Sequence, residues 1–248
     1  MAFNFGELKS GNPTLRKAFD RSRAAHGSEA MTVSGAVNKT GILFLLVLVG
    51  GYLGWGMLGT SAAPLMFVSL IVGFVLALVI SFKQTLAPAL SPVYAVAEGV
   101  VLGGVSSAAE KMYPGIAMNA LVLTLSTLGL MLTLYHFKII RYTPLFQKVL
   151  FFATGAIMIT YLADMVMGFF GHSVPYLNSA SPMGIAISVG IVVVAALNLI
   201  MDFEVINRGA QAGAPKYMEW YGGFALIVTL VWLYLEIIRL LSKLSSRR

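Results

Sequence analysis

Acidic side chains lie inside or at the edges of the apolar runs near the end of this sequence. Asp202 follows an apolar tripeptide, Glu219 opens the last apolar run, and Glu236 sits near the end of that run. A charge in apolar surroundings is costly, so such a residue usually has a role. Two carboxylates that share a site repel each other unless a proton or a cation lies between them. The pattern therefore points to a pH-sensitive or metal-binding site, and oxygen-only ligands favour calcium over zinc or copper.

Glu98 is a further candidate, because it is embedded in the apolar run between Ser91 and Ala109. An ionised carboxylate at the centre of a membrane helix costs about 2.5–3.5 kcal/mol on insertion scales. Glu98 must therefore face a partner, face water or carry a proton. A role in an ion or proton path and a hydrogen bond inside a packing helix are both open. Gly99 and Gly103, four residues apart, form a small face that allows close helix approach.

Other residues that could carry chemistry give weaker patterns. Asp164 is either another buried acid or marks the outer mouth, since its span is longer than needed. The histidines, His26, His136 and His172, lack metal-ligand spacing. The glycine-rich stretch 50–56 lacks the lysine–serine ending of a phosphate loop and favours close helix packing. There is no cysteine, which excludes disulfides and thiolate metal sites. No hydrolase motif stands out, so we expect no enzymatic activity.

The composition is typical of a membrane protein. Of the 248 residues, 58% are hydrophobic and only 11% are charged, whereas soluble domains carry about 25% charged residues. A spanning helix needs about 20 mostly apolar residues, and the runs here are continuous rather than alternating. We predict an all-α polytopic membrane protein with seven transmembrane helices. The expected spans are Gly41–Leu58, Ala63–Ser81, Ser91–Ala109, Ile116–Tyr135, Leu145–Phe170, Met183–Phe203 and Glu219–Leu241.

Three regions follow from this pattern: a polar, basic tail at 1–39, a membrane domain at 40–244 and a basic C-terminal tail at 245–248. The first tail is either disordered or carries a helix, at 15–27, that lies on the headgroups. The net charge of +7 indicates topology and contact with the lipid bilayer, and no nucleic-acid binding. The Lys/Arg bias places the N-terminus in the cytoplasm.

The C-terminal charges conflict with that orientation, because seven full spans place a basic tail on the outer side. A last segment that dips into the membrane and returns would remove the conflict. We favour seven full spans, since residues 221–235 are too apolar and too numerous to stay outside the hydrocarbon core.

The pairing of the acids depends on where the last hairpin turns. A turn near Gln211 puts Glu219 level with Asp202, and Glu236 then lies about 26 Å further along the helix. A tilt, an overhang or a broken last helix would bring Glu236 back to the same depth. Alternatively, both glutamates are interfacial anchors, and an i, i+3 pair with Arg239 accounts for Glu236.

The chain resembles the Bax inhibitor-1/YccA family, in its bacterial branch with a longer basic N-terminus. The resemblance covers roughly Gly41 to Leu244 and rests on seven closely spaced spans and on three motifs. These motifs are Glu98-Gly99-x3-Gly103 in the third span, Asn198-Leu-Ile-Met-Asp202-Phe-Glu-Val-Ile206 in the sixth and Trp232-Leu-Tyr-Leu-Glu236-Ile-Ile-Arg-Leu-Leu in the seventh.

The resemblance implies six helices packed around a central C-terminal helix in a plasma-membrane protein. It implies a pH-sensitive calcium leak controlled by two acids, which correspond here to Asp202 and Glu236. The second acid is Glu instead of the usual Asp, and it stands further from the first than in the family, so Glu219 is a rival partner. The family also includes members that restrain other membrane proteins, among them a membrane protease. A non-conducting interaction protein is therefore the alternative function. We expect no cofactor other than a calcium ion.

Overall fold

The computed structural model describes residues 30–57, 63–172, 174, 177 and 179–247. Within that part of the chain, seven helices are long and apolar enough to cross a membrane, and there is no β-strand. This confirms the predicted all-α polytopic membrane fold. The helices are α2 (Val33–Trp55), α3 (Ala63–Phe82), α4 (Ala87–Met112), α5 (Ile116–His136), α6 (Pro144–Phe169), α7 (Pro182–Gln211) and α8 (Met218–Ser245), with a short 3-10 turn, η2 (Gln84–Leu86), before α4.

Three of the helices begin at a hydroxyl side chain that caps the first turn. The side chains of Thr32, Thr143 and Ser181 each accept a hydrogen bond from the backbone N–H three residues further on. Pro144 and Pro182 then occupy the first helical position, where a missing N–H costs nothing. These caps fix where α2, α6 and α7 start.

Two helices extend about two turns beyond their predicted spans at one end. α2 begins at Val33 instead of Gly41, so the predicted polar tail overlaps it, and α7 runs to Gln211 instead of Phe203. The added turns contain polar side chains such as Asn38 and Lys39 in α2, which hydropathy does not distinguish from a loop. The tail helix predicted at 15–27 lies outside the described residues.

The start of α4 also differs from the prediction, because Pro92 lies inside this helix. α4 begins at Ala87, with Pro88 in its first turn, instead of at Ser91. Pro92 has no N–H, so the carbonyl of Pro88 has no partner in the helix. The hydroxyl of the buried Ser91 also has no hydrogen-bond partner. A proline near the start of a helix therefore did not mark its boundary.

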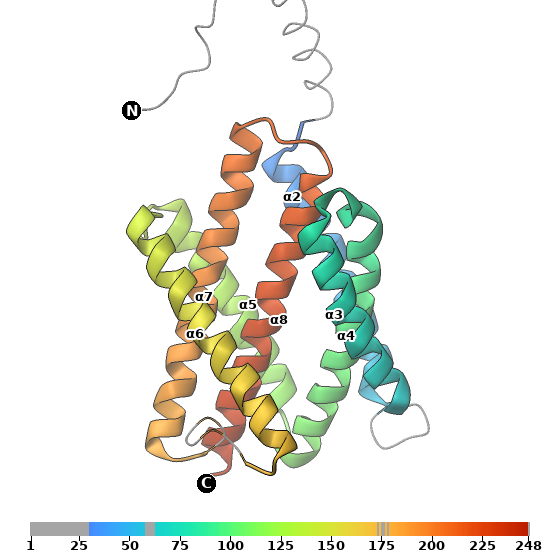
Figure 1. Cartoon of the computed structure of the whole chain (residues 1–248), viewed down its shortest axis with the longest axis vertical. Helices are drawn as coiled ribbons and strands as arrows, with labels where there is room; N and C mark the ends of the chain where they lie inside the picture. Colours follow the sequence, from blue (N-terminus) through green and yellow to red (C-terminus); the bar gives the residue numbers. More distant parts are fainter. Residues whose placement is uncertain (1–29, 58–62, 173, 175–176, 178, 248) are drawn as a thin grey trace, which may run out of the picture.

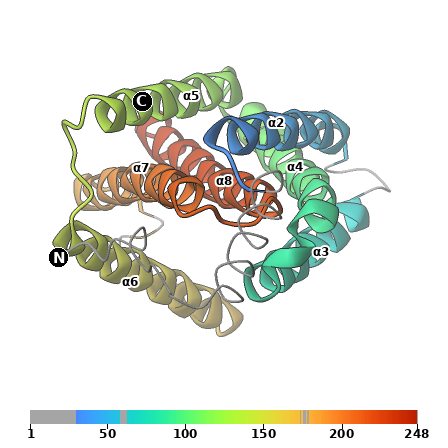
Figure 2. The same cartoon turned by 90° about the horizontal axis from the view of Figure 1, so that it is seen from above.

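The last helix, α8, occupies the centre of the bundle. It packs directly against α2, α4, α5 and α7, whereas α3 packs mainly on α4 and α6 mainly on α7. Figure 2 shows α8 between α7 and α4, with α3 and α6 at the periphery. α8 begins at the end of the bundle where α2 begins, and it finishes at the opposite end (Figure 1).

α4 and α8 run in the same direction, and two contacts fix their register. The rings of Tyr94 and Phe224 lie 4.9 Å apart in an edge-to-face arrangement. Further along, the hydroxyls of Ser106 and Tyr234 are hydrogen-bonded at 2.7 Å. A residue of α4 therefore lies level with the residue of α8 that follows it by about 128 to 130 positions.

α2 and α4 approach each other along a seam of glycines. A Cβ atom at Gly50 or Gly54 would collide with backbone carbonyl oxygens of α4, and one at Gly99 or Gly103 would collide with those of α2. The structure thus places the small face predicted on α4 against the glycine-rich stretch of α2. Only glycine allows this separation.

Candidate functional site

Asp202 lies on α7 and faces the middle of α8. Its Oδ2 atom accepts a hydrogen bond of 2.6 Å from the hydroxyl of Thr229. Thr229 is eleven residues from the start of α8 at Met218, close to the middle of that helix. The carboxylate therefore lies about midway along α8, at the depth of the apolar part of the bundle, where a charge is costly.

Glu98 lies on α4 at the same depth. The register of α4 and α8 puts Glu98 level with residues 226–228 of α8, and Asp202 is opposite Thr229. The Glu98 carboxylate lies against α3, since a Cβ atom at Gly73 would meet its Oε2 atom at 3.0 Å. The two acids thus approach the same level of α8 from α4 and from α7.

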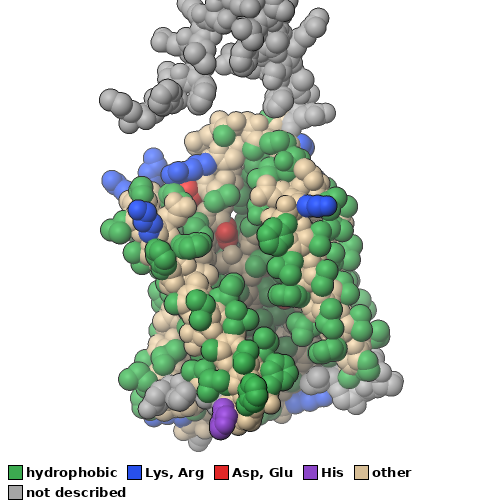
Figure 3. Space-filling model, in the orientation of Figure 1, with side chains coloured by type: hydrophobic (Ala, Val, Ile, Leu, Met, Phe, Trp, Pro, Cys, Tyr) green, Lys and Arg blue, Asp and Glu red, His purple; other side chains and the backbone are tan. Residues whose placement is uncertain are grey.

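Neither of these two acids is neutralised by a cationic side chain. Among the described residues, the ion pairs join Arg208 to Glu204, Lys216 to Glu219 and Arg239 to Glu236. Figure 3 shows that the molecule is hollowed between the α6–α7 side and the α3–α4 side, with an acidic side chain visible in the hollow. Carboxylates at membrane depth without a cationic partner are candidates for a functional role.

Glu219 holds the beginning of α8 against the beginning of α2. Its carboxylate is 1% exposed and accepts hydrogen bonds from the backbone N–H and the hydroxyl of Thr32, at 3.0 and 2.9 Å. Lys216 forms an ion pair with it at 2.9 Å. A Cβ atom at Gly35 would overlap this carboxylate. Glu219 therefore fastens two helix ends, and its charge is already compensated.

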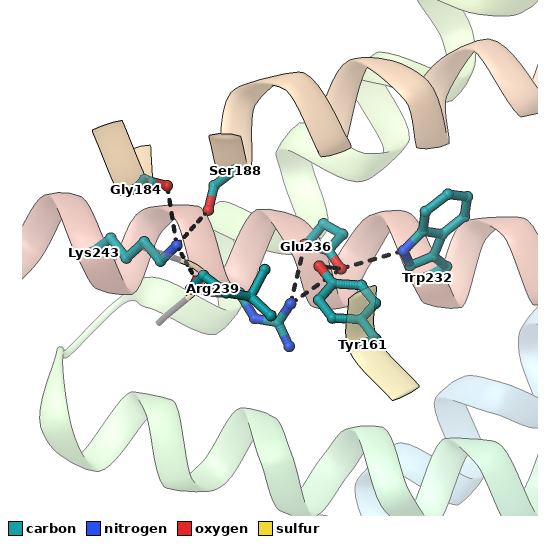
Figure 4. Close-up of polar contacts among 8 residues, drawn as sticks. Tyr161, Gly184, Ser188, Trp232, Glu236, Arg239 and Lys243 are labelled. Carbon is teal, nitrogen blue, oxygen red and sulfur yellow. Dashed lines mark hydrogen bonds and ion pairs between the residues drawn. The ribbon is translucent and has the colours of Figure 1, made fainter. Parts of the chain in front are cut away.

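Glu236 lies in a polar cluster near the other end of α8 (Figure 4). Its Oε1 atom accepts hydrogen bonds from the Tyr161 hydroxyl at 2.6 Å and from the Trp232 indole at 3.2 Å. Arg239 forms the i, i+3 ion pair at 3.4 Å and also stacks over the Tyr161 ring, 4.7 Å from its centroid. The simple pairing considered from the sequence is thus present, and Tyr161 extends it to α6.

The sequence did not single out Lys243, which is buried next to that cluster. Its ammonium group donates to the carbonyl oxygens of Leu177 and Gly184, at 2.6 and 3.1 Å, and to the hydroxyl of Ser188 at 2.7 Å. These three acceptors use all three of its hydrogens. The sequence could have indicated Lys243 through the spacing of Glu236, Arg239 and Lys243 at i, i+3 and i+7, because this spacing places the three residues on one helix face.

Asp164 lies near the end of α6. Its carboxylate accepts a hydrogen bond of 2.8 Å from the backbone N–H of Val174, in the connection to α7. Of the two roles open from the sequence, the structure shows contact with a loop at a helix end.

The family known as Bax inhibitor 1 like matches residues 12–246 of this chain. The chain belongs to the Bax inhibitor 1 like family. The match begins inside the predicted polar tail, earlier than the resemblance seen in the apolar spans. No curated protein matches the chain.

The two-acid site that the Bax inhibitor resemblance implies is not assembled in this structure. Asp202 lies opposite Thr229, and Glu236 follows Thr229 by seven residues, or about 10 Å along α8. Glu219 precedes Thr229 by ten residues, or about 15 Å. Glu219, one of the two partners left open from the sequence, does not lie level with Asp202. The hairpin turns near residues 215–216 instead of near Gln211, so the residue opposite Asp202 is Thr229.

The acids of this Bax inhibitor 1 like chain do not form a closed metal site. Within the described ranges, no group of three or more His, Asp or Glu side chains is placed to hold a metal ion. Calcium takes six to eight oxygen ligands. The oxygens of Asp202, Thr229 and Glu98 provide part of such a shell at most, and water would have to complete it.

Proposed function

We propose that this Bax inhibitor 1 like protein is a pH-sensitive cation leak, with calcium as the cation, and that its role is transport without enzymatic chemistry. The observation that carries the proposal is the position of Glu98 and Asp202. They lie at one depth beside α8, and neither has a cationic partner within the described part of the chain. Rings of acidic side chains select cations in channels, because they replace part of the hydration shell.

In this proposal, the two carboxylates act on the cation at one level beside α8. Asp202 is held there by Thr229, whose hydroxyl donates to it at 2.6 Å. Glu98 accepts no hydrogen bond from the described residues, so its carboxylate is free to turn toward an ion. Conduction needs binding that is strong enough for entry and weak enough for exit. Two carboxylates without a third protein acid meet both conditions.

The pH dependence follows from the charge of these two groups. When they are ionised, they attract a divalent cation into the bundle. When protons neutralise them, the attraction is lost and the apolar surroundings oppose the ion. We therefore expect the flux to fall as the pH is lowered.

Calcium flux into proteoliposomes tests the proposal. Glu98→Gln and Asp202→Asn should each lower the flux at least about tenfold, which corresponds to a barrier raised by about 1.4 kcal/mol. In each variant, the calcium flux should also change less with pH than in the parent protein. Glu219→Gln and Glu236→Gln are matched controls, because those carboxylates are already paired with Lys216 and Arg239. Equal flux in the parent protein and in both core variants would contradict the proposal.

The alternative is a non-conducting protein that binds and restrains a membrane protease or another membrane partner. It is favoured by Glu219 and Glu236, which both serve to hold helices together and leave no charge free. The same assay separates the two functions. A protein without flux that copurifies with one membrane protein at fixed stoichiometry supports the alternative.

A further inference from the structure

A pocket of about 400 Å³ lies between α2, α4, α5 and α8, on a side of the bundle that the acids Glu98 and Asp202 do not line. Most of its wall is apolar, with side chains such as Leu102 and Leu121. Leu48 and Met118, which also line it, are exposed on α2 and α5. The pocket is therefore accessible from the lipid phase, and its volume is within the range of about 300–1,000 Å³ found for small-ligand sites.

Two hydroxyl oxygens that line the pocket, those of Tyr234 and Thr124, can accept a hydrogen bond from a ligand. Ser106 donates its only hydrogen to the carbonyl of Leu102 at 2.6 Å, so Tyr234 must donate to Ser106 across the 2.7 Å contact. Thr124 likewise donates to the carbonyl of Ala120 at 2.8 Å. The oxygens of Tyr234 and Thr124 keep free lone pairs. A ligand that donates a hydrogen bond would complement them.

Glu110 closes the polar end of the pocket. Its carboxylate oxygens accept hydrogen bonds from the backbone N–H groups of Gly115 and Ala117, at 2.6 and 3.0 Å, at the start of α5. The charge of Glu110 is thus partly compensated by the helix N-terminus. The negative charge of Glu110 would repel a phosphate or carboxylate headgroup here, whereas a neutral hydroxyl headgroup could donate to these oxygens.

The length of the pocket matches one lipid leaflet. Its lining on α2 extends from Phe44 to Trp55, and these positions are about 16 Å apart along the helix. Half of a bilayer hydrocarbon core is about 15 Å thick. The apolar end lies near the middle of the membrane, and the end with Glu110, Tyr52 and Trp55 lies toward the surface at which α2 ends. Tyr and Trp are typical of that interface.

We propose that this pocket binds a neutral single-chain lipid with a hydroxyl headgroup, of the monoacylglycerol type. The chain lies between α2 and α5, and a headgroup hydroxyl donates a hydrogen bond to the oxygen of Tyr234. The site does not depend on the proposed cation path, because neither Glu98 nor Asp202 lines the pocket.

The experiment uses the full chain in lipid nanodiscs with a monoacylglycerol that carries a photoreactive diazirine on its chain. Crosslinked peptides should map to the pocket faces of α2 and α5, and monooleoylglycerol should suppress the labelling. The dimethyl ether of monooleoylglycerol has no hydrogen-bond donor. It should need a concentration about five to ten times higher to suppress the labelling equally, because the loss of one hydrogen bond lowers the affinity by that factor. Tyr234→Phe should abolish this preference for the hydroxyl form.

A second test of lipid binding fills the pocket with an added side chain. Gly51→Leu puts a side chain into the pocket, and its Cβ atom meets only the carbonyl oxygen of Gly99 at an ordinary 3.7 Å. Gly129→Leu makes the same change on α5, where a Cβ meets no atom within 4 Å, and serves as the control. Labelling should disappear in the first variant only. Labelling that survives Gly51→Leu, or an ether that competes as well as the alcohol in the parent protein, overturns the proposal.

Discussion

Glu219 and Glu236 each have a cationic neighbour, whereas Glu98 and Asp202 have none within the described part of the chain. The first two are nearly fully buried, with 1% and 3% of their side chains exposed. A buried acid with several donors around it stabilises the fold. An acid inside the apolar part of the bundle without a cationic partner is costly, and in the proposed leak Glu98 and Asp202 serve the passage of the ion. The distinction depends on the partners, because all four acids look alike in the sequence.

The Glu236 cluster gives a stability prediction at this scale. Glu236→Leu should lower the free energy of unfolding by about 2 kcal/mol, because the Tyr161 hydroxyl and the Trp232 indole lose their acceptor. Glu236→Gln keeps an acceptor and should cost less than about 1 kcal/mol, since Arg239 is 38% exposed and its ion pair is screened. Denaturant unfolding in detergent measures both values. Equal losses in the two variants would show that charge, and not the hydrogen bonds, matters here.

At the level of helices, the seam between α2 and α4 gives the next prediction. Gly103→Ala should destabilise the fold by about 1–3 kcal/mol, because the added Cβ collides with the carbonyl of Gly51 on a rigid backbone. Gly129→Ala, in open space on α5, should be neutral or stabilise by up to about 1 kcal/mol through helix propensity. The midpoints of thermal unfolding distinguish the two substitutions. Similar shifts for both would mean that the helices separate easily.

The sequence was sufficient to predict that each of these helices exists, but not to predict where each ends. Apolar content identified all seven spans, because a spanning helix cannot be built without it. The ends of α2 and α7 depend on polar turns that are stabilised by contacts distant in the chain, such as the one from Thr32 to Glu219. Hydropathy contains no information about such contacts.

The site was harder to predict, because a small error in the position of the α7–α8 turn causes a larger error in which residues face each other. Moving the hairpin turn by one residue moves the residue opposite Asp202 by two positions. The turn lies four to five residues beyond Gln211, so the level partner is Thr229 instead of a residue near Glu219. The types of the acidic residues could be read from the sequence, whereas their partners required the packed structure.

For the whole molecule, the orientation in the membrane can be tested with cysteines. The natural chain has no cysteine, so a maleimide can react only with the single cysteine that is introduced. Seven spans place the α5–α6 connection and the end of α8 on opposite sides. We expect Arg141→Cys to react with a membrane-impermeant maleimide only from the cytoplasmic face, and Ser246→Cys only from the other face. Labelling of both from the same side would contradict seven full crossings.

The two ends of α8 are tied to the surrounding helices by different chemistry. Glu219 binds Thr32 at the start of α8, and near its end Glu236 and Lys243 reach α6, α7 and the carbonyl of Leu177. A helix fixed at both ends cannot slide along its axis like a piston. The proposed path past Asp202 would therefore open by movement of the outer helices relative to α8. Among them, α6 packs mainly on α7, and its Tyr161 hydroxyl reaches Glu236 of α8.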